Sequence, residues 1–215
     1  MSTTKKVVII DYGLGNIYSI NQACFHLGYT TIVSADPKDI QAADSLILPG
    51  VGAFKIAMTQ LENKNLIQPI LDFVKTGKPM MGICLGMQLL CDSSEEFGLN
   101  KGLGLIPGYI KKFPSNYKGQ TLRVPNIGWN KIIESEQGIK WKGTPLSEIE
   151  HEDFVYFLHS YYAEPIFSNN ILSSSCYNGF EYCSAVNNEN VFGFQFHPEK
   201  SGNPGLSIIK NFLKL

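Results

Sequence analysis

Short apolar segments alternate with amphipathic segments of helical period in the first 90 residues. The alternation predicts strands over 6–11, 30–34, 45–48 and 79–83, and helices over 17–27, 54–61 and 85–90. The strands are apolar on both faces, which is typical of a parallel sheet covered by helices. A polar linker containing Asp36 and Pro37 is expected between the second and third strands.

The pattern changes after Cys91. Short strand-like segments, separated by Gly, Asn, Ser or Pro clusters, occupy 103–106, 109–113, 132–133, 154–158, 171–175 and 191–196, and a last helix is predicted over 205–215. Because few helices intervene, we expect antiparallel or mixed strands added to the sheet in this half. No repeat or low-complexity tract marks a linker, and 215 residues are few for two independent cores. We therefore expect one α/β domain over residues 1–215.

Charge and cysteine usage exclude several classes of function. The chain has 18 basic and 19 acidic residues and a net charge of −1, so it lacks the electrostatic footprint of a nucleic-acid or membrane-surface binder. No apolar stretch has the length of a signal sequence or a transmembrane helix. Five cysteines without CxxC or zinc-type spacing argue against a disulfide framework and a structural metal. A cytoplasmic protein with small-molecule or protein partners is expected.

The clearest candidate for chemistry is the pattern Gly82-x-Cys84-x-Gly86 between a predicted strand and a predicted helix. We interpret it as a nucleophile elbow with cysteine in place of serine, in which the glycines let two backbones pass closely. A thiol at the first turn of a helix lies at the positive end of the helix dipole, which favours the thiolate. The motif alone does not separate this hypothesis from an ordinary buried cysteine, which is what we expect of Cys91.

His197 is the best candidate for a partner of Cys84. His26, in the first predicted helix, and His151, in a charged stretch, have the character of surface residues. His197 instead ends an apolar strand and is followed by Pro198 and Glu199. An extended His-Pro-Glu segment would place residues 197 and 199 on the same side, so that the carboxylate could orient the imidazole. A cysteine, a histidine and a carboxylate form the general triad for acyl transfer.

Two glycine-rich turns follow predicted strands. The segment from Pro49 to Phe54 is either a simple turn or a source of backbone N–H groups for an oxyanion at the carboxyl edge of the sheet. The turn containing Gly13 and Gly15 invites a dinucleotide-binding interpretation, but Tyr18 stands where the third glycine is required. That interpretation is disfavoured.

Taken together, these motifs resemble the triad-type (class I) glutamine amidotransferases and, within them, the family of glutaminase subunits of imidazole glycerol phosphate synthase. The resemblance covers residues 11 to about 201. Its motifs are Asp11-Tyr-Gly-Leu-Gly-Asn16, Leu48-Pro-Gly-Val-Gly-Ala-Phe54, Gly82-Ile-Cys-Leu-Gly-Met-Gln88, Val124-Pro-Asn-Ile-Gly-Trp-Asn130, His159-Ser-Tyr161 and Gln195-Phe-His-Pro-Glu-Lys-Ser201. One departure is Asn126, where this family more often has histidine, and it bears on which synthase is served.

The resemblance implies a flavodoxin-like open sheet with helices on both faces and hydrolysis of the glutamine side-chain amide without a cofactor or metal. It assigns Cys84 as nucleophile, His197 as proton donor and Glu199 as its orienting carboxylate. By the same resemblance the oxyanion is received by N–H groups of Val51, Gly52 and Leu85, and glutamine is held by Gln88, Ser160 and Tyr161. His159 is expected to be structural, and Asn16, Asn126 and Trp129 are expected to face a partner, although Trp129 is equally compatible with a core position.

The resemblance also implies a heterodimer in which a (β/α)8 cyclase subunit of the histidine pathway uses the ammonia. A similar glutaminase that feeds a different synthase, for example in surface-sugar modification, is an alternative. A third possibility is a cysteine hydrolase or a non-catalytic module of similar fold, but this hypothesis does not explain the His197-Pro-Glu199 motif or Gln88.

The elbow interpretation predicts different results at two cysteines. Cys84→Ala should abolish glutamine hydrolysis and leave the fold intact, because a small residue adds no strain at the turn. Cys91→Ala is the matched control and should retain activity. The measurement is glutaminase activity with the partner present, and activity surviving in Cys84→Ala would show that another group is the nucleophile.

Overall fold

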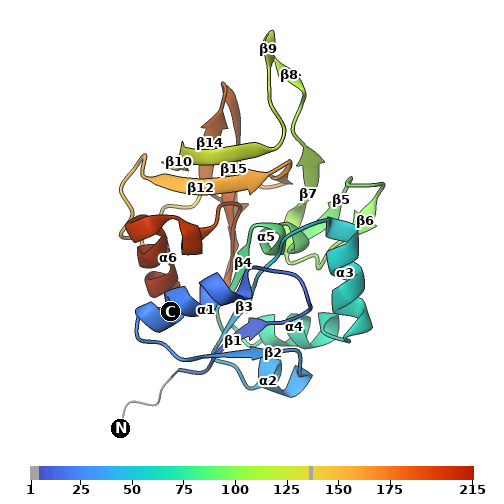
Figure 1. Ribbon diagram of the computed structural model, residues 1–215, viewed down its shortest axis with the longest axis vertical. Coiled ribbons are helices and arrows are strands. Elements are labelled where there is room, and N and C mark those ends of the chain that lie inside the picture. Colours follow the sequence, from blue (N-terminus) through green and yellow to red (C-terminus); the bar gives the residue numbers. More distant parts are fainter. Residues whose placement is uncertain (1–4, 136–137) are drawn as a thin grey trace.

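The computed structural model describes residues 5–135 and 138–215, so positions 1–4 and 136–137 of the expected domain lie outside the described residues. Its central feature is a mixed sheet whose first half is parallel (Figure 1). In spatial order the parallel strands are β2 (Thr31–Ser34), β1 (Val7–Ile10), β3 (Ser45–Leu48), β4 (Met80–Ile83) and β16 (Val191–Phe194). This order is that of a flavodoxin-like open sheet, as expected.

The second half of the sheet is mostly antiparallel, which confirms the expectation for the C-terminal part of the chain. It continues from β16 through β15 (Phe180–Asn188), β13 (Tyr161–Pro165), β7 (Ile106–Lys112), β5 (Cys91–Ser94) and β6 (Asn100–Lys101). Two further strands, β14 (Ile171–Tyr177) and β11 (Ile133–Glu134), extend from β15. Because β15 pairs with β16, the second half is joined directly to the parallel strands.

Helices cover both faces of the parallel strands, since every β1 side chain is buried and successive side chains point to opposite faces. Val7 and Ile9 pack with α1 and α6, whereas Val8 and Ile10 pack with the other helices. Figure 1 shows α1 and α6 on one side of the sheet and α3 and α4 on the other. The helices are α1 (Ile17–His26), α2 (Pro37–Gln41), α3 (Phe54–Asn63), α4 (Ile67–Val74), α5 (Leu85–Leu89) and α6 (Gly202–Lys214), with 3₁₀ turns η1 (Ser168–Asn170) and η2 (Pro198–Lys200).

Two small antiparallel pairs complete the described part of the chain. The hairpin of β8 (Asn116–Tyr117) and β9 (Gln120–Thr121) projects from the body of the molecule (Figure 1). The pair of β10 (Asn126–Lys131) and β12 (Phe154–His159) buries Val155 and Phe157 in the same core as α1 and α6. This pair therefore forms a second layer next to the end of β16.

Several expected elements differ from the structure. The expected linker at Asp36 is helix α2, because the Asp36 carboxylate accepts the Lys38 N–H and Pro37 begins the helix. The expected strand over 103–106 is mostly loop, and α6 begins at Gly202 rather than at 205. Helix α4 was not predicted although its pattern is amphipathic, and strands β13 and β15 were not predicted because buried and exposed positions do not alternate regularly along them. Within the described residues no helix is both long and apolar enough to cross a membrane.

The junction between β3, β4 and α5 requires glycine. A Cβ atom on Gly86 would overlap the carbonyl oxygen of Leu48, and one on Gly82 would lie 2.7 Å from the carbonyl oxygen of Gly86. A Cβ on Gly50 would lie 2.6 Å from the Gly86 nitrogen. Real Cβ atoms do not approach backbone so closely, so the glycine spacing in the elbow motif sets the distance between α5 and the two strands.

Gly86→Ala should therefore destabilise the protein strongly, by about 3 kcal/mol or more, because a backbone contact cannot relax as a side chain can. Gly119→Ala is the matched control: Gly119 has a φ of +80° and open space around its Cβ position. The control should lose only about 1 kcal/mol from backbone strain. Urea unfolding measures both, and equal losses would contradict the role of close backbone approach.

Candidate active site

Cys84 occupies a strained position between β4 and α5. Its φ is +55°, in a region that non-glycine residues rarely adopt, and its N–H donates to the Phe194 carbonyl oxygen over 2.7 Å. The thiol sulfur contacts the Leu158 carbonyl oxygen at 3.7 Å and the Gln195 amide nitrogen at 3.9 Å. A strained turn residue held by neighbouring strands is the geometry expected of a nucleophile elbow.

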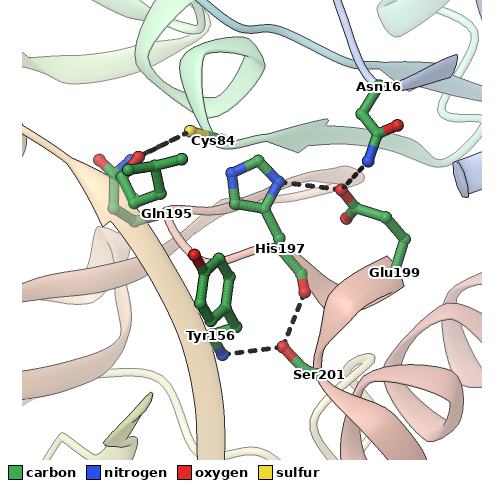
Figure 2. A network of polar contacts seen from close by, with 8 residues as sticks. Asn16, Cys84, Tyr156, Gln195, His197, Glu199 and Ser201 are labelled. Atoms are coloured by element: carbon green, nitrogen blue, oxygen red, sulfur yellow. Dashed lines mark hydrogen bonds and ion pairs between the residues drawn. The ribbon is translucent and has the colours of Figure 1, made fainter. Parts of the chain in front are cut away.

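His197 lies beside Cys84 and is held through its backbone. Its N–H donates to the Tyr156 carbonyl oxygen over 2.9 Å, and its carbonyl oxygen accepts from the Ser201 hydroxyl over 2.7 Å. The same hydroxyl accepts from the Tyr156 N–H at 3.0 Å. Figure 2 shows the imidazole between Cys84 and Glu199, with one ring nitrogen on the side of each. The ring therefore has a defined position relative to the thiol.

Glu199 contacts the imidazole by a different backbone path from the one expected. Its Oε1 lies 2.9 Å from His197 Nδ1 and accepts from the Asn16 amide at 3.3 Å. The segment was expected to be extended, but Pro198–Lys200 forms the turn η2 and only His197 has extended dihedral angles. The turn brings the carboxylate back under the ring, and its side chain is fully buried.

Electrostatics favour the protonated form of the His197 imidazole. Burial alone lowers the pKa of His197, but the contacts with Cys84 and Glu199 outweigh burial and raise the pKa to about 10. An imidazolium next to a thiol sulfur stabilises the thiolate. The arrangement can therefore supply a nucleophile and, from the ring nitrogen on the side of the sulfur, a proton for a leaving group.

A cavity of about 300 Å³ opens at the carboxyl ends of β3 and β4, above Cys84 and His197. It brings together the residues predicted for the oxyanion and the substrate, namely Val51, Gly52, Leu85, Gln88, Ser160 and Tyr161. Asn16 lines the same cavity. The position agrees with the general rule that open α/β sheets bind ligands at this edge.

Sequence reasoning missed Glu96, which also lines the cavity. Its Oε2 accepts the Phe54 N–H at the start of α3 over 2.6 Å, so the carboxylate is held in place. A carboxylate at the cavity wall suits the α-ammonium group of an amino acid. Glu96 lies in an irregular charged loop, and no local pattern distinguishes it from Glu95.

The predicted partner-facing residues do not share one environment. Trp129 is 52% exposed and contacts the Tyr156 ring edge-on. Asn126 is buried, at 1% exposure, and its amide nitrogen contacts His159 Nε2 and the Tyr182 hydroxyl, both at 3.2 Å. The expectation that Asn126 faces a partner is therefore wrong, because its polar side chain is used inside the second layer.

His159 has the structural position expected for it. Its Nδ1 lies 2.8 Å from the Tyr161 carbonyl oxygen, and burial lowers its pKa to about 4 despite that hydrogen bond. A neutral ring must donate to a carbonyl, so Nε2 is the acceptor for the Asn126 amide. Cys91 is fully buried, and His26 and His151 are exposed, as expected.

The strained cysteine, the buried imidazole–carboxylate pair and the cavity above them define the site of a cysteine-dependent acyl-transfer enzyme on a flavodoxin-like sheet. The family model described as "Glutamine amidotransferase class-I" matches residues 8–215. Two curated relatives are the imidazole glycerol phosphate synthase subunit HisH of Geobacter sulfurreducens, 43% identical over 96% of this chain and 97% of the relative, and HisH 1 of Legionella pneumophila strain Lens, 43% identical over 97% and 99%.

The chain belongs to the class I glutamine amidotransferases and, within that class, to the family of these HisH subunits. It is a glutamine amidotransferase enzyme. The solved structure of PurLQS from Thermotoga maritima has a TM-score of 0.72 at 20% identity over 99% of both chains, which supports the fold.

The free energy of unfolding should depend on pH through His197. Its folded pKa of about 10 lies above the ordinary value of 6.5, so the stabilisation is complete below pH 6.5 and is lost as the pH rises towards 10. The wild type should therefore lose stability relative to His197→Asn across this interval, measured by urea unfolding at several pH values.

His26→Asn is the control, because His26 is exposed, and it should follow the wild type at every pH. Parallel pH curves for the wild type and His197→Asn would rule out a protonated His197 in the folded state.

Proposed function

We propose that the chain is the glutaminase subunit of an imidazole glycerol phosphate synthase and hydrolyses L-glutamine to glutamate and ammonia. The observation that carries the proposal is the position of the His197 ring between Cys84 and Glu199, in a chain 43% identical to HisH subunits over nearly its whole length. We further propose that residues 1–215 form one amidotransferase domain, that it acts in the cytoplasm, and that the chemistry needs no cofactor or metal.

The first half of the reaction uses Cys84 and His197. The Cys84 thiolate attacks the carbon of the substrate carboxamide, and the charge of the tetrahedral intermediate develops on the carboxamide oxygen. The imidazolium of His197 protonates the departing nitrogen, ammonia leaves, and a thioester remains on the sulfur. Glu199 keeps the imidazole in position and stabilises its charge, and the 2.9 Å contact to Nδ1 supports this role.

The second half regenerates the Cys84 thiolate and the His197 imidazolium. Neutral His197 removes a proton from water, the hydroxide attacks the thioester, and the C–S bond breaks to give glutamate and the thiolate. In both halves the oxyanion is received by backbone N–H groups of Leu85 and of the turn at Val51 and Gly52. Support comes from the position of these three residues on the cavity wall beside Cys84.

The substrate amino acid is held across the cavity by groups of complementary charge and polarity. Gln88 and the backbone of Ser160 and Tyr161 bind its polar groups, and Glu96 pairs with its α-ammonium group. All four residues line the cavity, which supports the assignment. A cavity of about 300 Å³ suits a ligand of this size.

We propose that the ammonia is used by a second polypeptide, because the HisH relatives are named as subunits of a synthase. We propose a (β/α)8 cyclase subunit, bound as a heterodimer over the mouth of the cavity. One face of the β10–β12 pair supports this placement: Ile127, Trp129, Phe154 and Leu158 alternate along the paired strands and are each at least 40% exposed. Leu158 also lines the cavity, so an apolar surface of the partner that packed against Leu158 would shield the cavity from water.

Glutamine hydrolysis should be slow in the isolated chain, because an unregulated glutaminase would waste glutamine. Adding the cyclase subunit and its nucleotide ligand should raise the rate roughly 5- to 150-fold, the range of ordinary coupling free energies. The measurement is glutamate release with and without the partner. Equal rates, together with two separate peaks on a sizing column, would refute the proposed assembly.

A further inference from the structure

Gln195 is a fully buried polar residue that the proposed mechanism does not use. It follows β16, two residues before His197, and has 0% exposure. Its side chain lies between Gln88 and Cys84, and Figure 2 shows its amide directed at the sulfur. A carboxamide in the interior is costly unless both its donor and its acceptor find partners. The contacts of Gln195 with Gln88 and Cys84 therefore satisfy its buried amide and connect it to the site.

The direction of each amide follows from one backbone carbonyl. Tyr161 offers only a carbonyl oxygen to the Gln88 side chain at 3.0 Å, so the facing atom of Gln88 must be its NH₂ group. The second N–H of that group points to Gln195 at 3.0 Å, where the facing atom must be the oxygen. The NH₂ group of Gln195 consequently faces the Cys84 sulfur at 3.9 Å.

The orientation of the Gln88 amide determines which polar group faces the substrate. Both N–H groups of Gln88 are occupied by protein acceptors, so Gln88 offers the cavity a carbonyl oxygen and no donor. An acceptor suits the N–H groups of the substrate. If Gln195 did not accept from Gln88, the Gln88 amide would lose one of the two contacts that fix its direction.

The orientation of the Gln195 amide places an N–H donor next to the Cys84 sulfur. An N–H directed at sulfur stabilises a thiolate more than a neutral thiol, because hydrogen bonds to charged acceptors are the stronger ones. The contact is long even for sulfur, so its effect belongs at the lower end of the range for charged hydrogen bonds. Gln195 does not line the cavity and therefore acts only through its two neighbours.

We propose that Gln195 is a positioning residue for glutamine hydrolysis: its oxygen holds Gln88 with the carbonyl directed at the substrate, and its NH₂ group stabilises the Cys84 thiolate. The inference rests on the proposed function for the substrate, but its effect on the thiolate can be measured without any substrate.

Two substitutions separate the two roles. Gln195→Glu keeps an acceptor for the Gln88 N–H but removes the donor to sulfur, whereas Gln195→Met has similar length and removes both. The full chain is treated with iodoacetamide over a range of pH, and alkylation of Cys84 is followed by peptide mass spectrometry. The exposed Cys176 is the internal reference. The KM for glutamine is measured with the partner subunit present.

Both variants should raise the midpoint of the Cys84 alkylation profile by about one pH unit, so that alkylation below the midpoint is about tenfold slower. Only Gln195→Met should also raise the KM, by roughly fivefold. Asn211→Leu is the matched control, because Asn211 is another buried amide, bound to the Pro145 carbonyl oxygen, and is not among the residues that line the cavity. It should leave both quantities unchanged.

Coincident alkylation profiles for the wild type and Gln195→Glu, in chains with the same circular dichroism and Tm, would overturn the role at sulfur. An unchanged KM in Gln195→Met would overturn the role at Gln88. If wild-type chain with its partner does not hydrolyse glutamine, the proposed function fails, and the alkylation profiles still decide the role at sulfur.

Discussion

The structure depends on the close approach of α5 to the ends of β3 and β4. Gly86 lies against the Leu48 carbonyl, and Gly82 lies against Gly86, at distances that no side chain would permit. This contact leaves Cys84 no room for a relaxed turn, and its φ of +55° is the result. Packing of the sheet thus holds the strain at the thiol, and the proposed chemistry needs the thiol at that edge.

Burial gives the proposed triad its electrostatic character. In water a histidine gains little from a carboxylate neighbour, but the side chains of His197 and Glu199 are both almost completely buried. Burial lowers the pKa of the His197 ring, and the contacts with Cys84 and Glu199 raise the pKa by more than burial lowers it. Burial also makes a single amide such as Gln195 significant, because water does not compete for an N–H group that is fully buried.

The two halves of the sheet contribute different parts of the site. The parallel half supplies the elbow and the glycine turn at Val51 and Gly52. Ser160 lies between β12 and β13, and Tyr161 is the first residue of β13. His197 comes from the segment after β16, the last of the parallel strands. Since β16 pairs with β4, the histidine and the cysteine follow neighbouring parallel strands although 113 positions separate their numbers. The strand order therefore assembles the site.

The sequence alone predicted the parallel strands of the first 90 residues, the elbow and the members of the proposed triad, because these depend on short-range signals: apolar runs, glycine spacing and a proline after histidine. It also placed Cys91 in the core. Only the tertiary structure decided the rest. The burial of Asn126, the carboxylate of Glu96 and the contacts of Gln195 depend on residues distant in the chain, and α2 was missed although Asp36 and Pro37 signalled it. The local pattern of residues predicts whether a side chain points into the core or towards solvent. Which distant residues that side chain contacts depends on long-range packing.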